Sequence, residues 1–101
     1  MKKINRKTYT PPCNSGYTIY GINGCKYCNS AKELIKEKGK ICKVINCDDY
    51  ISSLRERDAF YTYISKYTKD KAYIYFPMIF NDKKFIGGYK ELMVHLGVKM
   101  T

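Results

Sequence analysis

The sequence predicts an α/β domain in which a four-stranded mixed sheet is flanked by about three helices. In the first half of the chain, short apolar runs alternate with helical patterns, as in strands that are joined by crossover helices. In the second half, an apolar run with a turn signal indicates an antiparallel hairpin, and an amphipathic pattern predicts a last helix. A Cys-X-X-Cys pair, Cys25 and Cys28, lies between the first strand and the first helix. The chemistry of the domain is therefore expected at this junction.

The length and the composition of the chain limit the kinds of protein that it can be. A chain of 101 residues, of which 45% are hydrophobic, suits one small domain with one core. Residues 1–15 begin with a basic stretch and contain Pro11-Pro12, so we expect a tail or an irregular lead-in before a domain over residues 16–101. The basic stretch lacks the apolar segment of a signal peptide, and no apolar run approaches the length of a membrane span. We expect a cytoplasmic protein without a membrane partner.

The first strand and the first helix flank the two cysteines. The apolar run Tyr17–Ile22 predicts a strand. A helical pattern begins near Asn29, and its spacing is marked by Ala31, Leu34, Ile35 and Lys38. Gly39 stands where a helix typically ends. This unit places the cysteine pair at the N-terminal end of a helix.

The second strand and the second helix complete the first half of the chain. Residues 41–47 predict a strand in which Cys42 and Cys47 are small residues that are buried or at the strand end. Asp48-Asp49 offers an N-cap for a long helix. Its inward face is predicted to carry Ile51, Leu54, Tyr61 and Ile64. The charged residues 55–58 of this helix then face water.

The second half of the chain predicts a hairpin and a last helix. Residues 73–80 form an apolar run that is interrupted by Pro77, and Asn81-Asp82 makes a turn into a short strand over residues 84–86. Gly87-Gly88 ends this hairpin. The last helix is predicted from apolar residues at positions i, i+3, i+4 and i+7, which are Tyr89, Leu92, Met93 and Leu96. His95 lies beside this apolar face and is expected to have a surface or structural role.

The Cys-X-X-Cys pair has the properties of a thiol–disulfide site. The free N–H groups and the positive dipole end of a helix stabilise a thiolate, so Cys25 is predicted to be the nucleophile. Cys28 lies less than one helical turn away and can attack a mixed disulfide on Cys25, which makes it the resolving thiol. Lys26 adds a cation beside Cys25, and Tyr27 offers a flat apolar surface with a hydroxyl at its rim. The pair is thus predicted to perform thiol–disulfide exchange.

A structural zinc site and a pair of inert buried cysteines are the alternative interpretations. A zinc site needs two more ligands at compact spacing, and the remaining candidates form no second ligand pair: Cys13, Cys42, Cys47 and His95. Gly24 and Lys26 around Cys25 favour an exposed loop over a buried pair. No metal site is therefore expected, and Cys13 is interpreted as incidental. An odd number of cysteines, five, suits a reducing compartment.

The net charge of +10 has two interpretations. Lysines occur in every segment, which is typical of a solvated surface. Nucleic-acid binding requires basic residues on one face with aromatic residues between them, and the candidate for this is the tyrosine-rich stretch 60–67. Its helical period favours packing in the core, so a nucleic-acid partner is not expected. A positive field nevertheless attracts anionic thiols and acidic proteins.

Three motifs in this order resemble the glutaredoxin family, which has the thioredoxin fold. Cys25-Lys26-Tyr27-Cys28 follows the first strand, Phe76-Pro77 begins the third, and Gly87-Gly88 precedes the last helix. The resemblance covers about residues 15–98. Thioredoxins are less similar, because they typically carry Trp-Cys-Gly-Pro-Cys and this chain has no tryptophan. The resemblance implies that the bond before Pro77 is cis, and that the backbone of Phe76 pairs with the cysteinyl unit of glutathione.

The resemblance implies a monomeric dithiol oxidoreductase that reduces protein or glutathione mixed disulfides, with glutathione as the electron donor. Its catalytic residues are then Cys25 and Cys28. The implied contacts to glutathione are Lys26, Tyr27, Phe76, Pro77, Gly87, Gly88, Tyr89 and Lys90. In this arrangement Lys26 lies near one carboxylate of glutathione, and the N–H groups of Tyr89 and Lys90 bind the other.

The sequence departs from the family pattern around the expected site. Ile22-Asn23-Gly24 replaces a lysine that commonly binds a carboxylate of glutathione, so Lys26 or Arg57 has to supply that charge. Tyr75-Phe76 replaces Thr-Val before the proline, and Tyr89-Lys90-Glu91 replaces a polar residue and an aspartate after the glycine pair. Lys26 also replaces the proline of Cys-Pro-Tyr-Cys, and relatives without that proline sometimes bridge a [2Fe–2S] cluster with glutathione. A cluster carrier, a thioredoxin-like protein disulfide reductase and a redox-inert binding module stay open as alternatives.

Overall fold

One mixed four-stranded sheet and three helices form the domain, which confirms the expected fold class. The computed structural model describes residues 9–70 and 73–98. The strand order is β2-β1-β3-β4, and the strands are β1 (Tyr17–Gly21), β2 (Cys42–Asn46), β3 (Met78–Asn81) and β4 (Lys84–Gly87). β1 is parallel to β2 and antiparallel to β3, and β3 is antiparallel to β4. The helices are α1 (Lys26–Glu37), α2 (Leu54–Thr68) and α3 (Tyr89–His95), and a 3₁₀ turn, η1 (Asp48–Tyr50), precedes α2.

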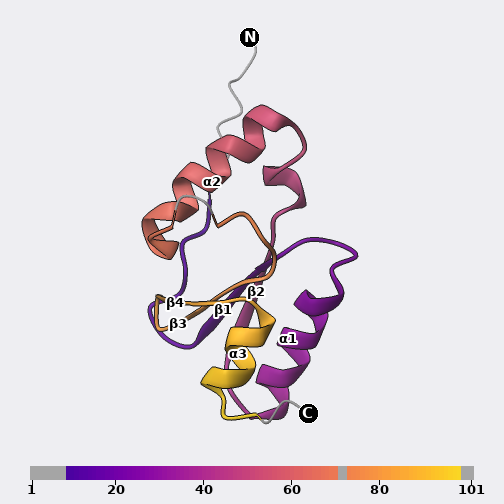
Figure 1. The fold of residues 1–101 in the computed structure, drawn as a ribbon, viewed down its shortest axis with the longest axis vertical. Helices are drawn as coiled ribbons and strands as arrows, with labels where there is room; N and C mark the ends of the chain where they lie inside the picture. Colours follow the sequence, from indigo (N-terminus) through magenta and orange to yellow (C-terminus); the bar gives the residue numbers. More distant parts are fainter. Residues whose placement is uncertain (1–8, 71–72, 99–101) are drawn as a thin grey trace.

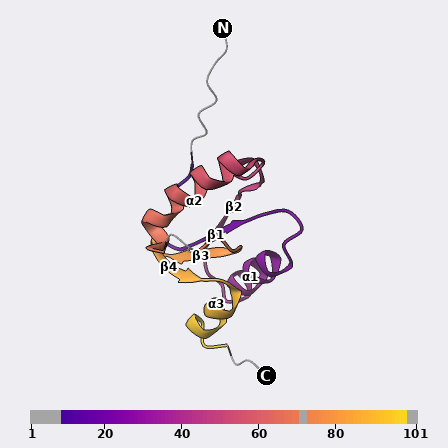
Figure 2. The ribbon, with the colours of Figure 1, turned by 45° about the horizontal axis from the view of Figure 1, so that its top comes forward.

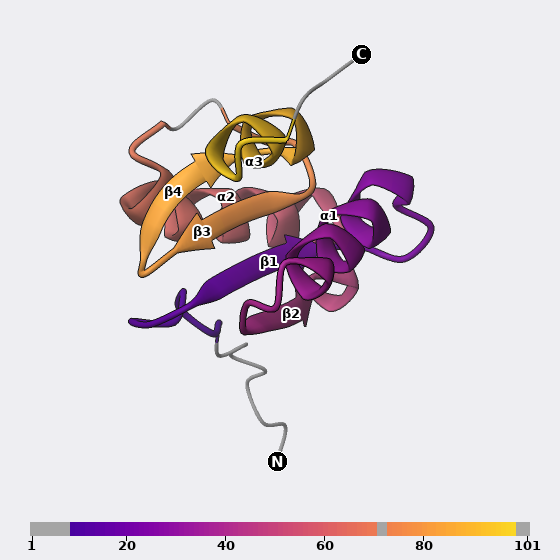
Figure 3. The same cartoon turned by 90° about the horizontal axis from the view of Figure 1, so that it is seen from below.

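The sheet is the middle of three layers. Helix α2 covers one face of the sheet, and α1 and α3 lie together on the other face (Figure 1). The two turned views, Figures 2 and 3, show the same separation of α2 from the other two helices. The central strand β1 is buried along its whole length, since it has neighbouring strands at both edges and helices on both faces. Within the described part of the chain, no helix is long and apolar enough to cross a membrane.

Alternating residues of the strands build two separate clusters of the core, one on each face. On the α2 face, the buried residues are Tyr20, Ile45, Cys47, Phe60, Ile64, Met78 and Phe80. On the face of α1 and α3, they are Tyr17, Ile19, Ala31, Ile35, Ile79 and Leu92. Cys42 packs against the second cluster and Cys47 belongs to the first, as expected for small residues of the β2 region.

Helices α1 and α2 begin where a side chain caps them, and both starts differ from the expected ones. Helix α1 begins at Lys26, ahead of the expected start near Asn29, because Cys25 is its N-cap residue. Helix α2 begins at Leu54, and the hydroxyl of Ser53 accepts the N–H of Glu56 at 3.1 Å. The Asp48-Asp49 pair forms η1 and does not cap α2. Because Leu54 stands at the helix start with 70% of its surface exposed, the expectation that it points inward was wrong.

The hairpin of the second half is shorter than expected. β3 begins at Met78 and not at residue 73, since Pro77 has no N–H to donate to a neighbouring strand. The turn lies at Asp82 and Lys83, whose φ angles of 50° and 72° are the left-handed values that a two-residue hairpin loop requires. The turn therefore lies one residue later than the expected Asn81-Asp82.

The lead-in packs on the domain from Tyr9 onward. The ring of Tyr9 lies 4.8 Å from that of Tyr50 and 4.7 Å from that of Tyr63, measured between centroids. The hydroxyl of Tyr20 donates to the carbonyl of Thr10 at 2.6 Å. The boundary at residue 15 stays a prediction, and these contacts show that residues close to it support the α2 face.

Phe60 is the residue on which the α2 face depends most, and its truncation is expected to be costly. The Phe60 side chain is fully buried, and its ring lies between 5.2 and 6.4 Å from the rings of Tyr9, Tyr20, Tyr50, Tyr61 and Phe76. Phe60→Ala is expected to lower the free energy of unfolding by about 3 to 5 kcal/mol. The matched control on the same helix, the exposed Leu54→Ala, is expected to change it by less than about 0.5 kcal/mol. Urea unfolding measures both, and equal losses would contradict this view of the core.

Candidate active site

The Cys25–Cys28 pair lies where β1 ends and α1 begins. Cys25 is the N-cap residue of α1, and its Sγ accepts a hydrogen bond from the backbone N–H of Cys28 at 3.1 Å. The two cysteines are joined by a disulfide, and their Cα atoms are 5.2 Å apart. Cys25 is half-buried, whereas Cys28 is 7% exposed. Cys25 is therefore the cysteine that a substrate reaches first.

Gly21, the last residue of β1, permits the close approach of Cys28. A Cβ atom at Gly21 would lie 3.0 Å from the Sγ and 3.2 Å from the Cβ of Cys28. These distances are shorter than ordinary contacts, so a side chain at this position would displace the inner cysteine. This role of Gly21 was not predicted, because the sequence shows a glycine in a strand but not which atom it meets.

A network of hydrogen bonds fastens the loop before Cys25 to the end of β2. The N–H of Asn23 donates to the Asp48 carboxylate, at 3.1 Å to Oδ1. Asn46 Nδ2 donates to Asn23 Oδ1 at 2.9 Å, and the N–H of Asp48 donates to Asn46 Oδ1 at 2.8 Å. These three residues therefore hold the chain in the direction from which it enters α1. None of them was predicted to belong to the site, and Asp48 was expected to cap a helix.

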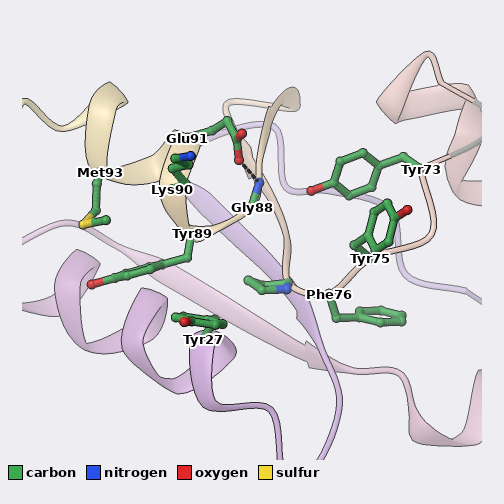
Figure 4. A pocket seen from close by; sticks show the side chains of 10 residues that line it. Tyr27, Tyr73, Tyr75, Phe76, Gly88, Tyr89, Lys90, Glu91 and Met93 are labelled. Carbon is green, nitrogen blue, oxygen red and sulfur yellow. Dashed lines mark hydrogen bonds between the residues drawn. The ribbon is translucent and has the colours of Figure 1, made fainter. Parts of the chain in front are cut away.

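A cleft of about 380 Å³ opens beside the first turn of α1. Figure 4 shows Tyr27 and Tyr89 on one side of this cleft and Tyr73 and Tyr75 on the other. The rings of Tyr27 and Tyr89 are stacked with their centroids 5.7 Å apart, and those of Tyr73 and Tyr75 meet edge to face at 5.6 Å. The other lining residues are Phe76, Pro77, Gly88, Lys90, Glu91 and Met93. The walls of the cleft are thus mainly aromatic.

The segment before β3 forms the wall of the cleft that faces the core. The Phe76–Pro77 bond is cis, as the resemblance implied. The ring of Phe76 is nearly parallel to that of Phe60, at 6.4 Å between centroids and 11° between planes. Pro77 is buried, and Phe76 is half-buried. This wall is therefore fixed by packing against the α2 cluster.

The structure brings together most, but not all, of the predicted contact residues. Those that line the cleft are Tyr27, Phe76, Pro77, Gly88, Tyr89 and Lys90. Lys26 and Arg57 are exposed and are not among the lining residues, and Lys26 Nζ lies 6.0 Å from the centroid of the Tyr27 ring. Gly87 is buried and has a φ of 130°, and a Cβ there would lie 2.8 Å from Glu91 Cγ. Gly87 therefore makes room for Glu91 beneath the cleft.

Four lining residues were not predicted as contacts: Tyr73, Tyr75, Glu91 and Met93. For Tyr73 and Tyr75 the sequence did offer a signal, which was the bulk of the aromatic run before Pro77. Glu91 has a defined partner, because the N–H of Gly88 donates to its Oε1 at 2.9 Å. This bond turns the carboxylate toward the start of α3.

The remaining titratable groups near the core have structural surroundings. Burial, with a smaller effect of the Asp48 carboxylate, raises the pKa of Cys47 to about 12. Burial also raises the pKa of Cys42, against an opposing effect of Lys32. Both thiols stay protonated at neutral pH and are poor nucleophiles for that reason. His95 Nε2 lies 3.1 Å from the hydroxyl of Tyr17. In residues 9–70 and 73–98, no three His, Cys, Asp or Glu side chains are grouped so that they could bind a metal ion.

Comparison with known proteins identifies the family. A family model described as glutaredoxin matches residues 17–86, a range that includes both cysteines and the cis proline. The chain belongs to the glutaredoxin family. It is therefore a thiol–disulfide oxidoreductase by family and by fold, and its Cys25–Cys28 pair fits that chemistry.

Solved glutaredoxin structures are similar to this glutaredoxin over most of its length. Glutaredoxin 1 from Francisella tularensis, complexed with cacodylate, is 31% identical with a TM-score of 0.65, and the match covers 80% of this chain and 91% of that one. A buckwheat glutaredoxin–glutathione complex is 24% identical with a TM-score of 0.64, and the match covers 83% and 71%. A dithiolic glutaredoxin from Trypanosoma brucei brucei is 24% identical with a TM-score of 0.57, covering 80% and 78%. The last two show the shared fold alone. A search of the curated proteins found no match.

The network around Asn23 predicts a local effect of Asp48. Asp48→Ala removes the acceptor of the Asn23 N–H, so the amide of Asn23 is expected to exchange with solvent faster, on the order of tenfold, while global stability falls by about 1 kcal/mol. Asp49→Ala, a change at the exposed neighbour in the same turn, is the matched control and should leave this amide protected. Hydrogen exchange followed by NMR measures both variants. An unchanged exchange rate at Asn23 in Asp48→Ala would show that the loop is held by other contacts.

Proposed function

We propose that this glutaredoxin reduces mixed disulfides of proteins and of glutathione, with glutathione as its electron donor. The observation that carries the proposal is the position of Cys25, half-buried at the N-cap of α1, with the N–H of Cys28 directed at its sulfur. This N–H and the dipole of α1 stabilise negative charge on the sulfur, so Cys25 is assigned as the nucleophile. Cys28, which is buried and disulfide-bonded to Cys25, is assigned as the resolving thiol. Membership of the glutaredoxin family supports the choice of glutathione as the donor.

The proposed exchange with a protein–glutathione mixed disulfide requires only Cys25. Its thiolate attacks the glutathione sulfur, the protein sulfur leaves as a thiolate that takes up a proton, and Cys25 is left in a disulfide with glutathione. The thiolate of a second glutathione then attacks that glutathione sulfur. This step forms oxidised glutathione and returns Cys25 as a thiolate. In the net reaction, the mixed disulfide and one free glutathione become the protein thiol and oxidised glutathione.

The glutathione contacts are proposed for the cleft and its rim. Lys90 supplies a positive charge among the lining residues, and Lys26 supplies a second one from the exposed first turn of α1. The proposed apolar and backbone contacts are Tyr27, Phe76, Pro77, Gly88 and Tyr89. Gly87 does not line the cleft and lies against Glu91, so it is proposed to act indirectly, by setting the course of the backbone before α3.

The two cysteines are expected to differ in their contributions. Cys25→Ser should abolish reduction of a glutathionylated peptide, whereas Cys28→Ser should keep it within about threefold, since the exchange with a glutathione mixed disulfide does not use the second thiol. The assay follows NADPH consumption with glutathione and glutathione reductase, and Cys47→Ser serves as a control for loss of a buried thiol. Equal loss in Cys25→Ser and Cys28→Ser would contradict the assignment.

The same assay separates the two candidate electron donors. Replacing glutathione and its reductase by thioredoxin reductase is expected to lower the rate of the unmodified protein to background. A rate that is higher with thioredoxin reductase than with glutathione would replace the proposed function by that of a thioredoxin-like protein disulfide reductase.

Lys26 is expected to attract the glutathione moiety of the substrate. Lys26→Glu should raise KM for a small glutathionylated substrate several-fold at low ionic strength, and the effect should shrink as salt rises, because the side chain is exposed. Lys36→Glu, at the other end of the same helix, changes the net charge equally and is the matched control. If both variants have the same KM, the attraction belongs to the overall charge and not to Lys26.

A further inference from the structure

The cleft beside the first turn of α1 leaves aromatic side chains exposed. Tyr75 is 65% exposed and Tyr27 is 55% exposed, although both line the cleft. Together with Tyr73, Phe76 and Tyr89 they provide five rings around one space (Figure 4). Concave sites lined by aromatic side chains, with a few polar groups at fixed places, are typical of binding pockets. The uncovered rings therefore point to an occupant with a ring or a long apolar side chain.

The rings that form the cleft are held in place before anything binds. Tyr27 is stacked against Tyr89, so helices α1 and α3 contribute one wall together. On the opposite wall, the Tyr73 ring meets Tyr75 at 5.6 Å and packs against Phe85 at 4.8 Å. Tyrosine offers a large contact area at a small loss of conformational entropy, and a prearranged site loses even less on binding. The geometry thus favours specific recognition of a side chain over non-specific hydrophobic binding.

The overall charge of the chain indicates the sign of the occupant. Lys90 is the cation among the described lining residues, and the carboxylate of Glu91 is engaged by the N–H of Gly88. The chain as a whole carries a net charge of +10. A segment with acidic residues is therefore attracted to the protein, and a basic segment is repelled.

We propose that the cleft binds an aromatic side chain that lies next to the disulfide cysteine of an acidic protein segment, and that Tyr75 and Tyr27 select such protein disulfides as substrates. The position of Tyr27 carries this inference, because Tyr27 lines the cleft and also stands between the two cysteines in the chain, so an occupant of the cleft is brought near the dithiol. The inference rests on the proposed thiol–disulfide exchange and adds the class of protein substrate to it.

In this reaction the protein segment, not glutathione, occupies the cleft. The Cys25 thiolate attacks one sulfur of the substrate disulfide, and the other sulfur leaves as a thiolate that takes up a proton. The Cys28 thiolate then attacks Cys25, which releases the second substrate thiol and forms the Cys25–Cys28 disulfide seen in the structure. Two glutathione molecules return the pair to thiols and leave as oxidised glutathione. The cleft acts in the first step, where it holds the substrate sulfur in line with Cys25.

The test compares two peptides that are each closed by one disulfide and carry two glutamates. One has phenylalanine next to a cysteine, and the other has serine at that position. For the unmodified protein, kcat/KM is expected to be about three- to tenfold higher for the phenylalanine peptide. Tyr75→Ser should bring this ratio close to one. Ile74→Ser is the matched control, because Ile74 is the adjacent residue, is 45% exposed and does not line the cleft, so it should keep the ratio.

The charge of the substrate forms a second arm of the test. Replacing the two glutamates of the phenylalanine peptide by lysines should lower kcat/KM, and the difference should diminish at high salt. An equal kcat/KM for the phenylalanine and serine peptides, or an unchanged ratio in Tyr75→Ser, would overturn the inference. Faster turnover of the lysine peptide would overturn the preference for acidic segments.

A binding measurement separates failure of the inference from failure of the proposed function. A phenylalanine peptide with both cysteines replaced by serine cannot react, but it should still shift the NMR signals of the Tyr27 and Tyr75 rings. Such shifts without peptide reduction would refute the proposed redox function and retain the aromatic site. Reduction of both peptides at equal rates without these shifts would refute the aromatic site and retain the redox function.

Discussion

The contact between the end of β1 and the first turn of α1 is the constraint on which the site depends. Gly21 has no Cβ, and only this absence leaves space for Cys28 at the distance that the structure shows. With Cys28 seated against the strand, Cys25 is turned outward as the N-cap residue, and its sulfur meets the N–H of Cys28. One buried and one more accessible cysteine follow from this close contact, so the proposed difference between nucleophile and resolving thiol rests on packing as well as on charge.

The cleft beside this contact is supported by both halves of the core. Its aromatic wall from α1 and α3 stands on the cluster to which Leu92 and Ile35 belong, and the wall from the segment before β3 stands on Phe60 through Phe76. The sheet separates the two clusters, and the cleft lies between Tyr27 and Tyr89 on one side and Tyr73 and Tyr75 on the other (Figure 4). A change in either cluster therefore moves one wall relative to the other, which couples the stability of the core to the shape of the site.

The sequence predicts the fold and the cysteine pair well because both are encoded in local patterns. Alternating apolar runs and the Cys-X-X-Cys setting need only near neighbours, as do the Phe76-Pro77 and Gly87-Gly88 motifs that carried the family resemblance. The missed features depend on how separate elements pack: Gly21 meets Cys28, Asn23 meets Asp48, and Tyr73 reaches the start of α3. Asp48 is an example. An acidic residue before a helical pattern is typical of an N-cap, but in the structure the Asp48 carboxylate accepts the N–H of Asn23 instead.

The replacement of the family's upstream lysine has a consequence for how charge acts at this site. In this chain the loop before Cys25 carries Asn23, which is committed to the hydrogen bonds with Asp48 and Asn46. Positive charges lie instead on α1, at exposed Lys26 and Lys32, and on α3, at exposed Lys90. Exposed charges act over a distance set by salt and raise the rate of encounter, but they discriminate weakly between anions of similar charge. Discrimination in this glutaredoxin therefore has to come from groups that make close contact, and the aromatic walls of the cleft are placed to do this.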